Sequence, residues 1–319
     1  MRLGILGTGK IVQDFLPIVK SIPAIELVGL LSTPRSVARA RELQATYRIG
    51  TVYTDYAALL ADTTIDTVYV ALPNSLHYDY AKRALQAGKN VICEKPFTLV
   101  ASQLTELIEL AGRQDLVLIE AITNQYLENY QAIKRDLKII ECNYSQYSSR
   151  YDQFKAGTIL PAFNPKLGGG ALMDLNIYNI HFVVGLLGAP THVQYLANVE
   201  RNIDTSGILV LTYPNVKVVC IGAKDSTSPV RSTIQGTTGS IIVNGPTNTV
   251  ESITEIAHDG TTTDLALNQA EHRMYAEFVA FERLIANHDM VTVKRQLDHS
   301  QAVMEVVDQA LASAGLQLG

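Results

Sequence analysis

Residues 65–96 read IDTVYVALPNSLHYDYAKRALQAGKNVICEKP, and this stretch decides the fold. An apolar run from Val68 to Leu72 is typical of a buried strand, and a helical segment from Leu76 to Ala87 follows it. Gly88 ends the helix, and a second apolar run begins at Asn90. A strand, a helix and a second strand within roughly thirty residues predict a parallel crossover unit.

Polar residues follow both of these predicted strands. Pro73 and Asn74 come directly after the first strand, and Glu94, Lys95 and Pro96 come directly after the second. Because open parallel sheets bind ligands at the carboxyl ends of their strands, these residues should line a binding site. Lys95 precedes a proline that restricts the local backbone, so we take this lysine as the centre of the chemistry.

The composition argues against several classes of protein. The chain has 319 residues, 47% of them hydrophobic and 18% charged, which is enough for two domains with their own cores. It contains no run of about 18 apolar residues, so we expect no membrane span. A formal net charge of −5 without a basic cluster argues against a nucleic-acid partner. The seven histidines show no metal-ligand spacing, so we expect no metal site.

The cysteines and the N-terminus predict the compartment. Cys93, Cys142 and Cys220 are odd in number and widely spaced, which suits a reducing environment better than a disulfide framework. The first predicted strand begins almost at Met1, which leaves no room for a signal peptide. We therefore expect a cytoplasmic protein.

A glycine turn stands near the N-terminus, where residues 2–12 read RLGILGTGKIV. Gly7 and Gly9 allow a sharp turn, so that a pyrophosphate could approach the N–H groups at the start of the next helix. The third small residue of the dinucleotide fingerprint falls at Val12, which is larger than the strict pattern allows. An ordinary turn between a strand and a helix is the alternative, but the alternation of strands and helices that follows favours dinucleotide binding.

The second predicted strand, Ile25 to Leu31, ends in Ser32, Thr33, Pro34 and Arg35. NAD-specific sites usually place a carboxylate here to accept hydrogen bonds from the ribose 2′-hydroxyl. Hydroxyls and an arginine suit a 2′-phosphate better, so NADP is the predicted cofactor, with NAD as the alternative. The alternative for Arg35 is that it merely begins a solvated helix.

The order of the predicted elements indicates two domains. Strands and helices alternate through residues 1–121, which predicts an α/β fold, a doubly wound parallel sheet of the Rossmann type. Residues 122–319 read as an α+β domain with a large, mostly antiparallel open sheet. Its expected elements are a helix over 128–137, a long strand over 139–151, a hairpin around residues 214–215, and helices over 269–287 and 298–314.

The segment from Gly168 to His181 is the second informative stretch. In a helix that starts near Ala171, Asp174, Tyr178 and His181 share one face. The helix is otherwise apolar, so these polar groups should be buried and need partners. Hydrogen bonds within the core would explain them, but the three upstream glycines favour close approach of a ligand to the backbone.

Together these motifs resemble the glucose-fructose oxidoreductase/inositol dehydrogenase (Gfo/Idh/MocA) family. The resemblance rests on the N-terminal glycine turn, on Pro73-Asn74 with His77, on Cys93-Glu94-Lys95-Pro96, and on GGGALMDLNIY from Gly168. It covers nearly the whole chain, and the EKP and GGGALxD motifs are its most specific parts. It implies hydride transfer between NAD(P) and a secondary alcohol or carbonyl of a sugar, polyol or cyclic diol.

The resemblance also assigns roles to residues. Lys95 matches the catalytic lysine and Asp174 the substrate-binding aspartate. Tyr178 matches the proposed acid/base of the branch that contains glucose-fructose oxidoreductase, dihydrodiol dehydrogenase and xylose dehydrogenases, and His181 is then a neighbour in the substrate site. The predicted cofactor-binding residues are Gly7, Thr8, Gly9, Lys10, Ile11, Ser32, Thr33, Arg35, Leu72, Pro73, Asn74, His77, Glu94, Lys95 and Pro96.

Two departures from the family pattern bear on the substrate. Val12 replaces a small residue of the fingerprint. An Arg-Phe-His-Pro stretch that is common in the branch is replaced by Asn124-Gln125-Tyr126-Leu127-Glu128, so a substrate-facing arginine is missing. This puts the usual pyranose substrates in doubt.

The expected chemistry follows from the side chains. The ammonium of Lys95 would favour the tyrosinate form of Tyr178, which would exchange the proton with the substrate oxygen, while Asp174 would orient a hydroxyl and counter the lysine charge. Whether Lys95 or Tyr178 is the immediate proton partner stays open at this point. The alternative to an enzyme is a non-catalytic regulator that senses dinucleotide or sugar on the same fold. In either case we expect a homodimer or homotetramer formed through the C-terminal sheet.

Overall fold

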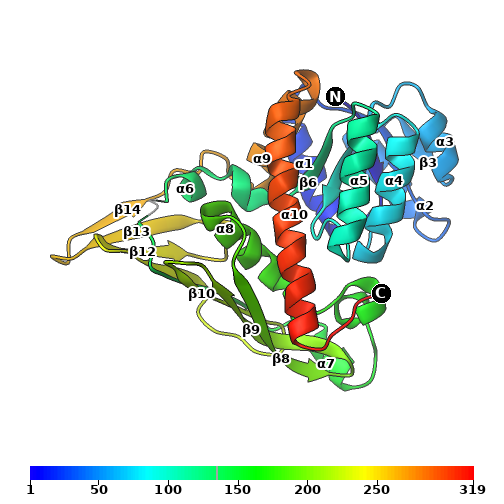
Figure 1. The fold of residues 1–319 in the computed structure, drawn as a ribbon. Coiled ribbons are helices and arrows are strands. Elements are labelled where there is room, and N and C mark those ends of the chain that lie inside the picture. Colours follow the sequence, from blue (N-terminus) through cyan, green and yellow to red (C-terminus); the bar gives the residue numbers. More distant parts are fainter. Residues whose placement is uncertain (134–135) are drawn as a thin grey trace. The chain divides into compact units, whose positions relative to one another are not determined.

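The computed structural model describes residues 1–133 and 136–319, which divide into two compact units. The first unit comprises residues 1–98, 102–121 and 274–298. The second unit comprises residues 99–101, 122–273 and 299–319. Figure 1 labels the elements of both. The helical residues 274–298 group with the first unit although they follow most of the second in sequence.

The first unit is built on a parallel sheet with the strand order β3-β2-β1-β4-β5-β6. Its strands are β1 (Arg2–Leu6), β2 (Glu26–Leu31), β3 (Thr51–Tyr53), β4 (Thr67–Val70), β5 (Asn90–Glu94) and β6 (Leu118–Ala121). The helices are α1 (Lys10–Val19), α2 (Val37–Tyr47), α3 (Tyr56–Ala61), α4 (His77–Gln86), α5 (Ala101–Arg113) and α9 (Met274–Ala286). The order reverses between β1 and β4, where ligands bind to open α/β sheets. The predicted Rossmann-type sheet is confirmed.

Aromatic packing explains why α9 belongs to this unit. All four residues of β4 are buried, as expected for a central parallel strand covered on both faces. Phe278 of α9 lies 4.1 Å from the ring centre of Phe15 in α1 and 5.2 Å from that of Tyr69 in β4. The apolar side of α9 therefore completes the core over one face of the sheet.

The second unit holds a larger sheet with the strand order β14-β13-β12-β11-β7-β10-β9-β8. The strands are β7 (Ile139–Ser145), β8 (His192–Glu200), β9 (Ile203–Thr212), β10 (Lys217–Ala223), β11 (Arg231–Gln235), β12 (Gly239–Asn244), β13 (Ser252–Ala257) and β14 (Thr262–Leu265). The β7–β10 pair is parallel and the other pairs are antiparallel. This confirms the predicted mostly antiparallel sheet, including the β9–β10 hairpin around residues 214–215.

The helices of the second unit are α6 (Glu128–Gln131), α7 (Tyr151–Lys155) and α8 (Ile177–Leu187), with α10 (Met290–Ser313) running from the first unit into it. One apolar stretch, residues 165–187, is long enough to cross a membrane, but 78% of its most apolar window is buried inside the protein. It is therefore the core helix of this unit.

Two predicted elements of this unit are shorter than expected. The strand expected over 139–151 ends at Ser145, because Tyr151 and Phe154 turn into α7 and pack against Phe163. The helix expected over 128–137 is observed only as α6, and residues 134–135 lie outside the described part of the chain.

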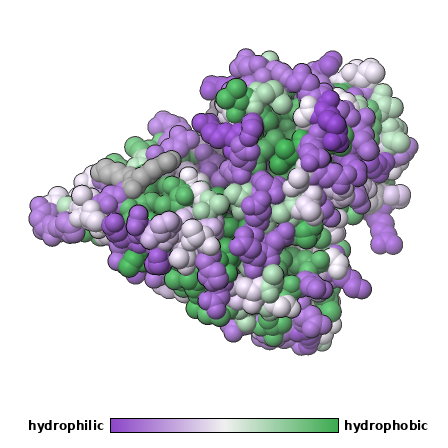
Figure 2. All heavy atoms as spheres, viewed as in Figure 1, coloured by the Kyte–Doolittle hydropathy of each residue, from purple (hydrophilic) through white to green (hydrophobic). Residues whose placement is uncertain are grey.

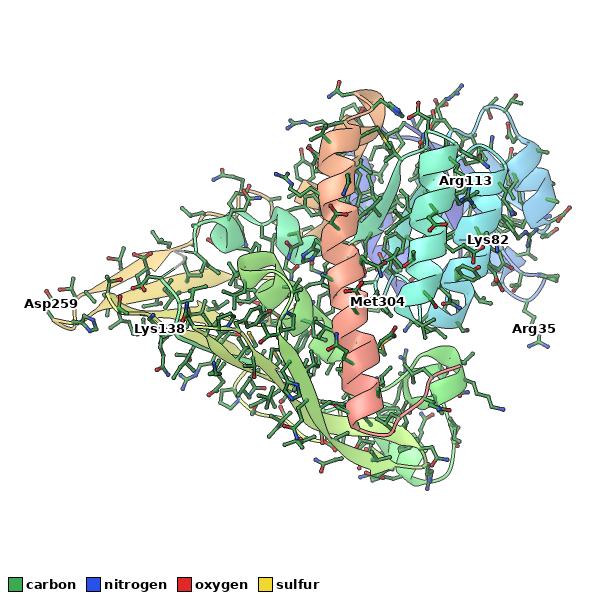
Figure 3. All side chains as sticks on the ribbon, in the orientation of Figure 1. Arg35, Lys82, Arg113, Lys138, Asp259 and Met304 are labelled. Atoms are coloured by element: carbon green, nitrogen blue, oxygen red, sulfur yellow. The ribbon has the colours of Figure 1, made fainter. Side chains whose placement is uncertain are left out.

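Figure 2 shows that hydrophilic side chains cover the tip of the β13–β14 hairpin, where Figure 3 labels Asp259.

Candidate active site

Gly7 joins the ends of three strands in the first unit. Its φ of +105° lies in the region that favours glycine, and a Cβ at this position would lie 2.7 Å from the carbonyl oxygen of Ala71, just after β4. Its N–H donates to the carbonyl of Leu31 at the end of β2 (3.0 Å). The turn after β1 is therefore tightly fixed against its neighbours, and only glycine fits there.

The N-terminus of α1 suits a phosphate group. Gly9 is the N-cap residue, no side chain caps the helix, and its first turn contains no acidic residue. A Cβ on Gly9 would meet nothing within 4 Å, so there is open space beside the turn. Free backbone N–H groups and the helix dipole favour an anion at such a place. Val12, the departure from the fingerprint, is fully buried in the core beneath the helix.

The other residues of this turn have local partners. The carbonyl of Thr8 accepts a hydrogen bond from Gln13 Nε2 (3.0 Å), which holds the turn to the helix. The exposed Lys10 pairs with Asp14 at 3.1 Å. Such a surface pair is weak, so Lys10 could exchange it for a phosphate contact at little cost.

Hydroxyl groups gather after β2, where the ribose of a dinucleotide would lie. The Oγ atom of Ser36 lies 2.9 Å from both Ser32 Oγ and Thr33 Oγ1. Arg35 is exposed, and Figure 3 shows its side chain extending away from the protein. Arg39 is held by Glu42 and by Gln13 Oε1, each at 2.9 Å. The segment 32–36 thus offers hydroxyls and one extended guanidinium and no carboxylate.

His77 ties the ends of β4 and β5 together. Its Nδ1 lies 2.8 Å from the carbonyl oxygen of Pro96, and its Nε2 lies 2.8 Å from that of Leu72. The ring is fully buried, and this burial lowers the pKa of His77. Both ring nitrogens face backbone oxygens, so His77 acts by fixing the two loops.

The Glu94-Lys95-Pro96 segment leaves β5 at its carboxyl end. The carboxylate of Glu94 is buried and accepts a hydrogen bond from the hydroxyl of Tyr69. The N–H of Phe97 donates to Glu120 Oε1 (3.2 Å), which fixes the chain just beyond the proline. Lys95 is half-buried between these anchors and stands close enough to His77 to disfavour protonation of its ring. A well-anchored loop therefore carries the predicted catalytic lysine.

In the second unit, Asp174 and Tyr178 stand at the start of the core helix. Residues Leu172–Asn176 form one π-helical turn that leads into α8. Single π-turns of this kind often occur at functional sites. The side chain of Asp174 is 43% exposed, whereas Tyr178 is 7% exposed. The ring of Tyr178 lies 6.1 Å from that of Tyr144 on β7.

Lys224, which the sequence did not single out, contacts Asp174. Its Nζ donates to Asp174 Oδ2 at 2.7 Å and to the carbonyl oxygen of Ala162 at 2.6 Å. The side chain of Lys224 is only 2% exposed. Within this unit, Asp174 thus forms an ion pair with Lys224, a contact that the sequence analysis did not predict.

Buried asparagines hold the π-turn and the first turn of α8. Asn124 Nδ2 donates to the carbonyl of Tyr178 (3.0 Å), and Asn176 Nδ2 donates to that of Cys220 (3.2 Å). Asn179 Nδ2 donates to Asn176 Oδ1 at 2.8 Å. Asn124 belongs to the stretch that replaces the Arg-Phe-His-Pro motif of the family branch. In this chain, the replaced stretch therefore supplies a hydrogen bond that fixes the backbone at Tyr178.

His181 lies on the same helix but is directed into the core. It is fully buried, and its Nδ1 lies 2.9 Å from His299 Nε2 on α10. Its carbonyl accepts from Gln125 Nε2 (3.0 Å). This placement favours a packing role for His181 over contact with a substrate.

Gly170, the last of the three glycines before the helix, packs against other protein atoms. A Cβ on Gly170 would lie 2.0 Å from Asp204 Oδ1, and its φ is +104°. Asp204 Oδ2 accepts hydrogen bonds from the N–H of Leu172 (2.6 Å) and from the hydroxyl of Tyr195 (2.8 Å). Burial raises the pKa of Asp204 to about 6. Protein atoms thus occupy the space that the sequence interpretation reserved for a ligand.

The predicted site residues therefore form two groups. Those after β1, β2, β4 and β5 gather at the carboxyl edge of the first sheet, and Asp174 and Tyr178 stand together in the second unit. Among the described residues, no three His, Cys, Asp or Glu side chains gather as metal ligands.

Comparison with protein families gives matches to both halves of the chain. Residues 1–151 match the model of an oxidoreductase family with an NAD-binding Rossmann fold, and residues 136–242 match the GFO/IDH/MocA C-terminal domain. Among solved structures, KijD10, a 3-ketoreductase from Actinomadura kijaniata in complex with NADP and TDP-benzene, has the same fold (TM-score 0.82, 21% identity, covering 98% of this chain and 97% of that one).

Curated relatives match over the full length. The scyllo-inositol 2-dehydrogenase (NADP+) IolU of Bacillus subtilis is 32% identical over 99% of this chain and 98% of its own. The trans-1,2-dihydrobenzene-1,2-diol dehydrogenase of Xenopus tropicalis is 26% identical over 99% and 98%. The D-xylose 1-dehydrogenase (NADP+) of Hypocrea jecorina is 27% identical over 99% and 92%. These relatives are dehydrogenases, which decides for the enzyme over the regulator, and the chain belongs to the GFO/IDH/MocA family of NAD(P)-dependent oxidoreductases.

Proposed function

We propose that this enzyme transfers a hydride between NADP and a secondary alcohol of a cyclic polyol or sugar, with scyllo-inositol as the first candidate substrate. The observation that carries the proposal is the pairing of a half-exposed carboxylate, Asp174, with Tyr178 on the next helical turn. Such a pair can hold one hydroxyl of a polyol and exchange the proton of another. The full-length similarity to IolU supports the choice of an inositol.

The proposed cofactor site is the carboxyl edge of the first sheet, in a dinucleotide-binding domain over residues 1–121. The uncapped start of α1 and the open space beside Gly9 fit a pyrophosphate. Ser32, Thr33 and Arg35 would hold a 2′-phosphate, and no carboxylate in that segment would repel it. Residues 122–319 then form the substrate domain, although residues 274–298 pack with the first unit.

The protein's own groups prepare the reaction. When bound, the nicotinamide takes up or gives the hydride. Tyr178 exchanges the proton with the substrate oxygen, and the ammonium of Lys95 stabilises negative charge on that oxygen. Asp174 accepts a hydrogen bond from a neighbouring substrate hydroxyl and thereby sets which carbon faces the nicotinamide.

The missing arginine narrows the substrate class. Where the family branch commonly carries Arg-Phe-His-Pro, Asn124 is buried and bonded to the carbonyl of Tyr178. The position therefore serves the helix, and no cationic side chain from this stretch is available to a substrate. The substrate hydroxyls would instead be bound by Asp174 and Tyr178.

A substrate panel tests the proposal. Oxidation of scyllo-inositol, myo-inositol, D-xylose and trans-1,2-dihydrobenzene-1,2-diol should be followed by the absorbance of the reduced nicotinamide, with NADP and with NAD. We expect the highest kcat/KM for an inositol with NADP. Turnover of the xylose or of the diol alone would contradict the inositol assignment, and no turnover of any alcohol would contradict the proposed substrate class.

We also propose that the outer face of the second sheet joins two or four copies of the chain. Leu196, Ile208 and Ile221 stand opposite one another on β8, β9 and β10, so they share one face of the sheet. Leu196 and Ile208 are 56% and 42% exposed. A row of exposed aliphatic side chains on a sheet is typical of a protein interface. Light scattering should give a dimer or tetramer for the wild type and a smaller species for Ile208→Lys.

Free thiols support a reducing compartment. Cys93, Cys142 and Cys220 are buried and form no disulfide. We therefore propose a cytoplasmic location, which fractionation of the source cells would test.

A further inference from the structure

Lys224 is a buried cation that forms an ion pair with the carboxylate of Asp174. It follows β10 directly and donates to Asp174 Oδ2 and to the carbonyl oxygen of Ala162. Its Nζ also lies 4.5 Å from the ring centre of Phe163. Two hydrogen bonds and an aromatic face therefore fix the ammonium in one place.

The two partners of this ion pair differ in exposure. Lys224 is 2% exposed, whereas the side chain of Asp174 is 43% exposed. A buried ammonium depends on its partner, but a half-exposed carboxylate can also be solvated. The pair thus holds one oxygen of Asp174 from the inside of the protein while the rest of the carboxylate faces outward.

We propose that Lys224 is a positioning residue for the substrate, acting through Asp174. It holds the Asp174 carboxylate in one rotamer, so that a substrate hydroxyl meets an acceptor already in place. The inference rests on the proposed role of Asp174 in substrate binding. Lys224 itself does not contact the reacting atoms.

A kinetic double-mutant cycle tests the positioning role. Lys224→Met should lower kcat/KM by about ten- to a hundredfold with the best substrate of the inositol, xylose and dihydrodiol panel. The dissociation constant of NADPH, measured by fluorescence, should stay unchanged. In an Asp174→Asn background, Lys224→Met should have an effect of less than about twofold, because the group it acts through is already changed. Equal losses in both backgrounds, or no loss in the wild-type background, would refute the positioning role.

A stability cycle tests the ion pair without any substrate. Asp174→Asn should lower the Tm more than Lys224→Met, because it leaves the ammonium buried beside a neutral group. Adding Lys224→Met to Asp174→Asn should therefore raise the Tm of that variant. If Lys224→Met lowers the Tm equally with either residue at position 174, the pair is not coupled and the inference fails.

Lys89→Met serves as the matched control. Lys89 is also buried, but it donates only to the carbonyl oxygens of Asp62 and Ile65 in the first unit. Its substitution should lower the Tm and leave kcat/KM unchanged. If the pair is coupled in stability but no alcohol of the panel is turned over, the proposed function fails and the positioning role fails with it. If the panel is turned over but Lys224→Met is silent, only the inference fails.

Discussion

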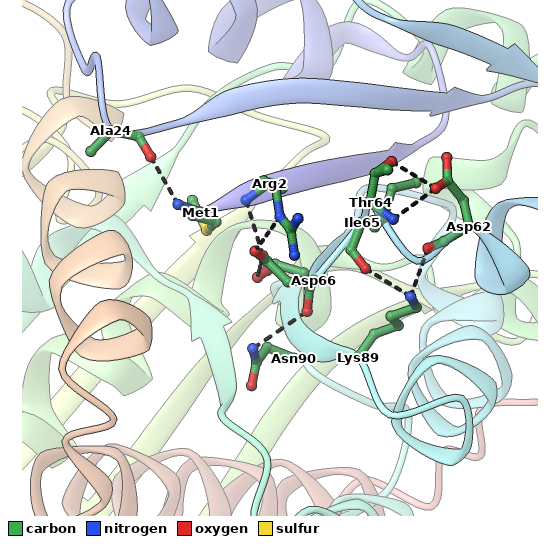
Figure 4. Close-up of polar contacts among 10 residues, drawn as sticks. Met1, Arg2, Ala24, Asp62, Thr64, Ile65, Asp66, Lys89 and Asn90 are labelled. Carbon is green, nitrogen blue, oxygen red and sulfur yellow. Dashed lines mark hydrogen bonds and ion pairs between the residues drawn. The ribbon is translucent and has the colours of Figure 1, made fainter.

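Two lysines flank strand β5 and differ in their surroundings: Lys89 precedes the strand and Lys95 follows it. At the amino end, Lys89 is buried and donates to the carbonyls of Asp62 and Ile65 at 2.8 and 2.7 Å (Figure 4). Around it, Arg2 pairs with Asp66, and the N-terminal ammonium donates to the carbonyl of Ala24. This end of the sheet is closed by contacts within the protein.

At the carboxyl end, the anchored groups are the backbone and the residues beside Lys95. The ring of His77 lies between the carbonyl oxygens of Leu72 and Pro96, and the carboxylate of Glu94 accepts a hydrogen bond from Tyr69. The neighbouring helix α1 starts without a side-chain cap. The first N–H groups of α1 therefore remain available to a ligand at this edge. The chain is anchored at both ends of this buried strand. The contacts at the amino end stabilise the fold, and we propose that the carboxyl end binds the cofactor.

The largest expected effect comes from Lys95→Ala. Removing a preorganised charge beside the reacting oxygen should lower kcat by about a hundred- to a thousandfold. Binding of NADPH, followed by fluorescence, should change little, because the proposed phosphate site is the turn at Gly7 and Gly9. A fully active Lys95→Ala variant would contradict the catalytic role of Lys95. The proposed functional difference between the two ends of β5 would then fail.

Tyr178→Phe extends the comparison to the second unit. Loss of the acid/base hydroxyl should lower kcat by about a hundredfold, while the ring keeps the fold. Tyr213→Phe is the matched control, because its hydroxyl donates to the carbonyl of Gly188 at the other end of α8 (2.9 Å). That control should lose about 1 kcal/mol of stability and no activity. Near-normal turnover in Tyr178→Phe together with a loss in His181→Ala would transfer the role to His181.

Arg35→Ala should have a smaller effect, confined to the cofactor. A charge-assisted contact to the 2′-phosphate would be lost, so the preference for NADP over NAD should fall by about tenfold or more. Calorimetric titration of both cofactors measures this. An NAD preference in the wild-type enzyme, or an unchanged ratio in the variant, would show that the hydroxyl-rich segment after β2 does not read the phosphate.

Lys89→Met should have the smallest effect on the reaction. Two buried carbonyls would lose their donor, which should cost about 1–3 kcal/mol of unfolding free energy in a denaturant titration. Rates measured well below the Tm should match those of the wild type. A large loss of kcat in a stable Lys89→Met variant would mean that the amino end also contributes to the reaction.

The stretch 65–96 determined much of the fold because its information is local. The period of its apolar residues, Gly88 and the proline after Lys95 predict a strand–helix–strand unit without reference to the rest of the chain. The same holds for the glycine turn after β1 and for the β9–β10 hairpin. The family motifs then placed Lys95, Asp174 and Tyr178 in one reaction, and the family itself is confirmed.

Only the tertiary structure decided which side chains are partners. Lys224 pairs with Asp174 across 50 residues, and His181 meets His299 across 118. A lysine just after a strand looks like any exposed lysine in the sequence, because nothing local indicates that it is buried. Likewise, the sequence suggested that the missing side chain of Gly170 lets a ligand approach, but the carboxylate of Asp204 occupies that space. Burial and pairing depend on elements that are distant in the chain. The sequence alone therefore identified the candidate side chains, and the tertiary structure determined which groups each of them contacts.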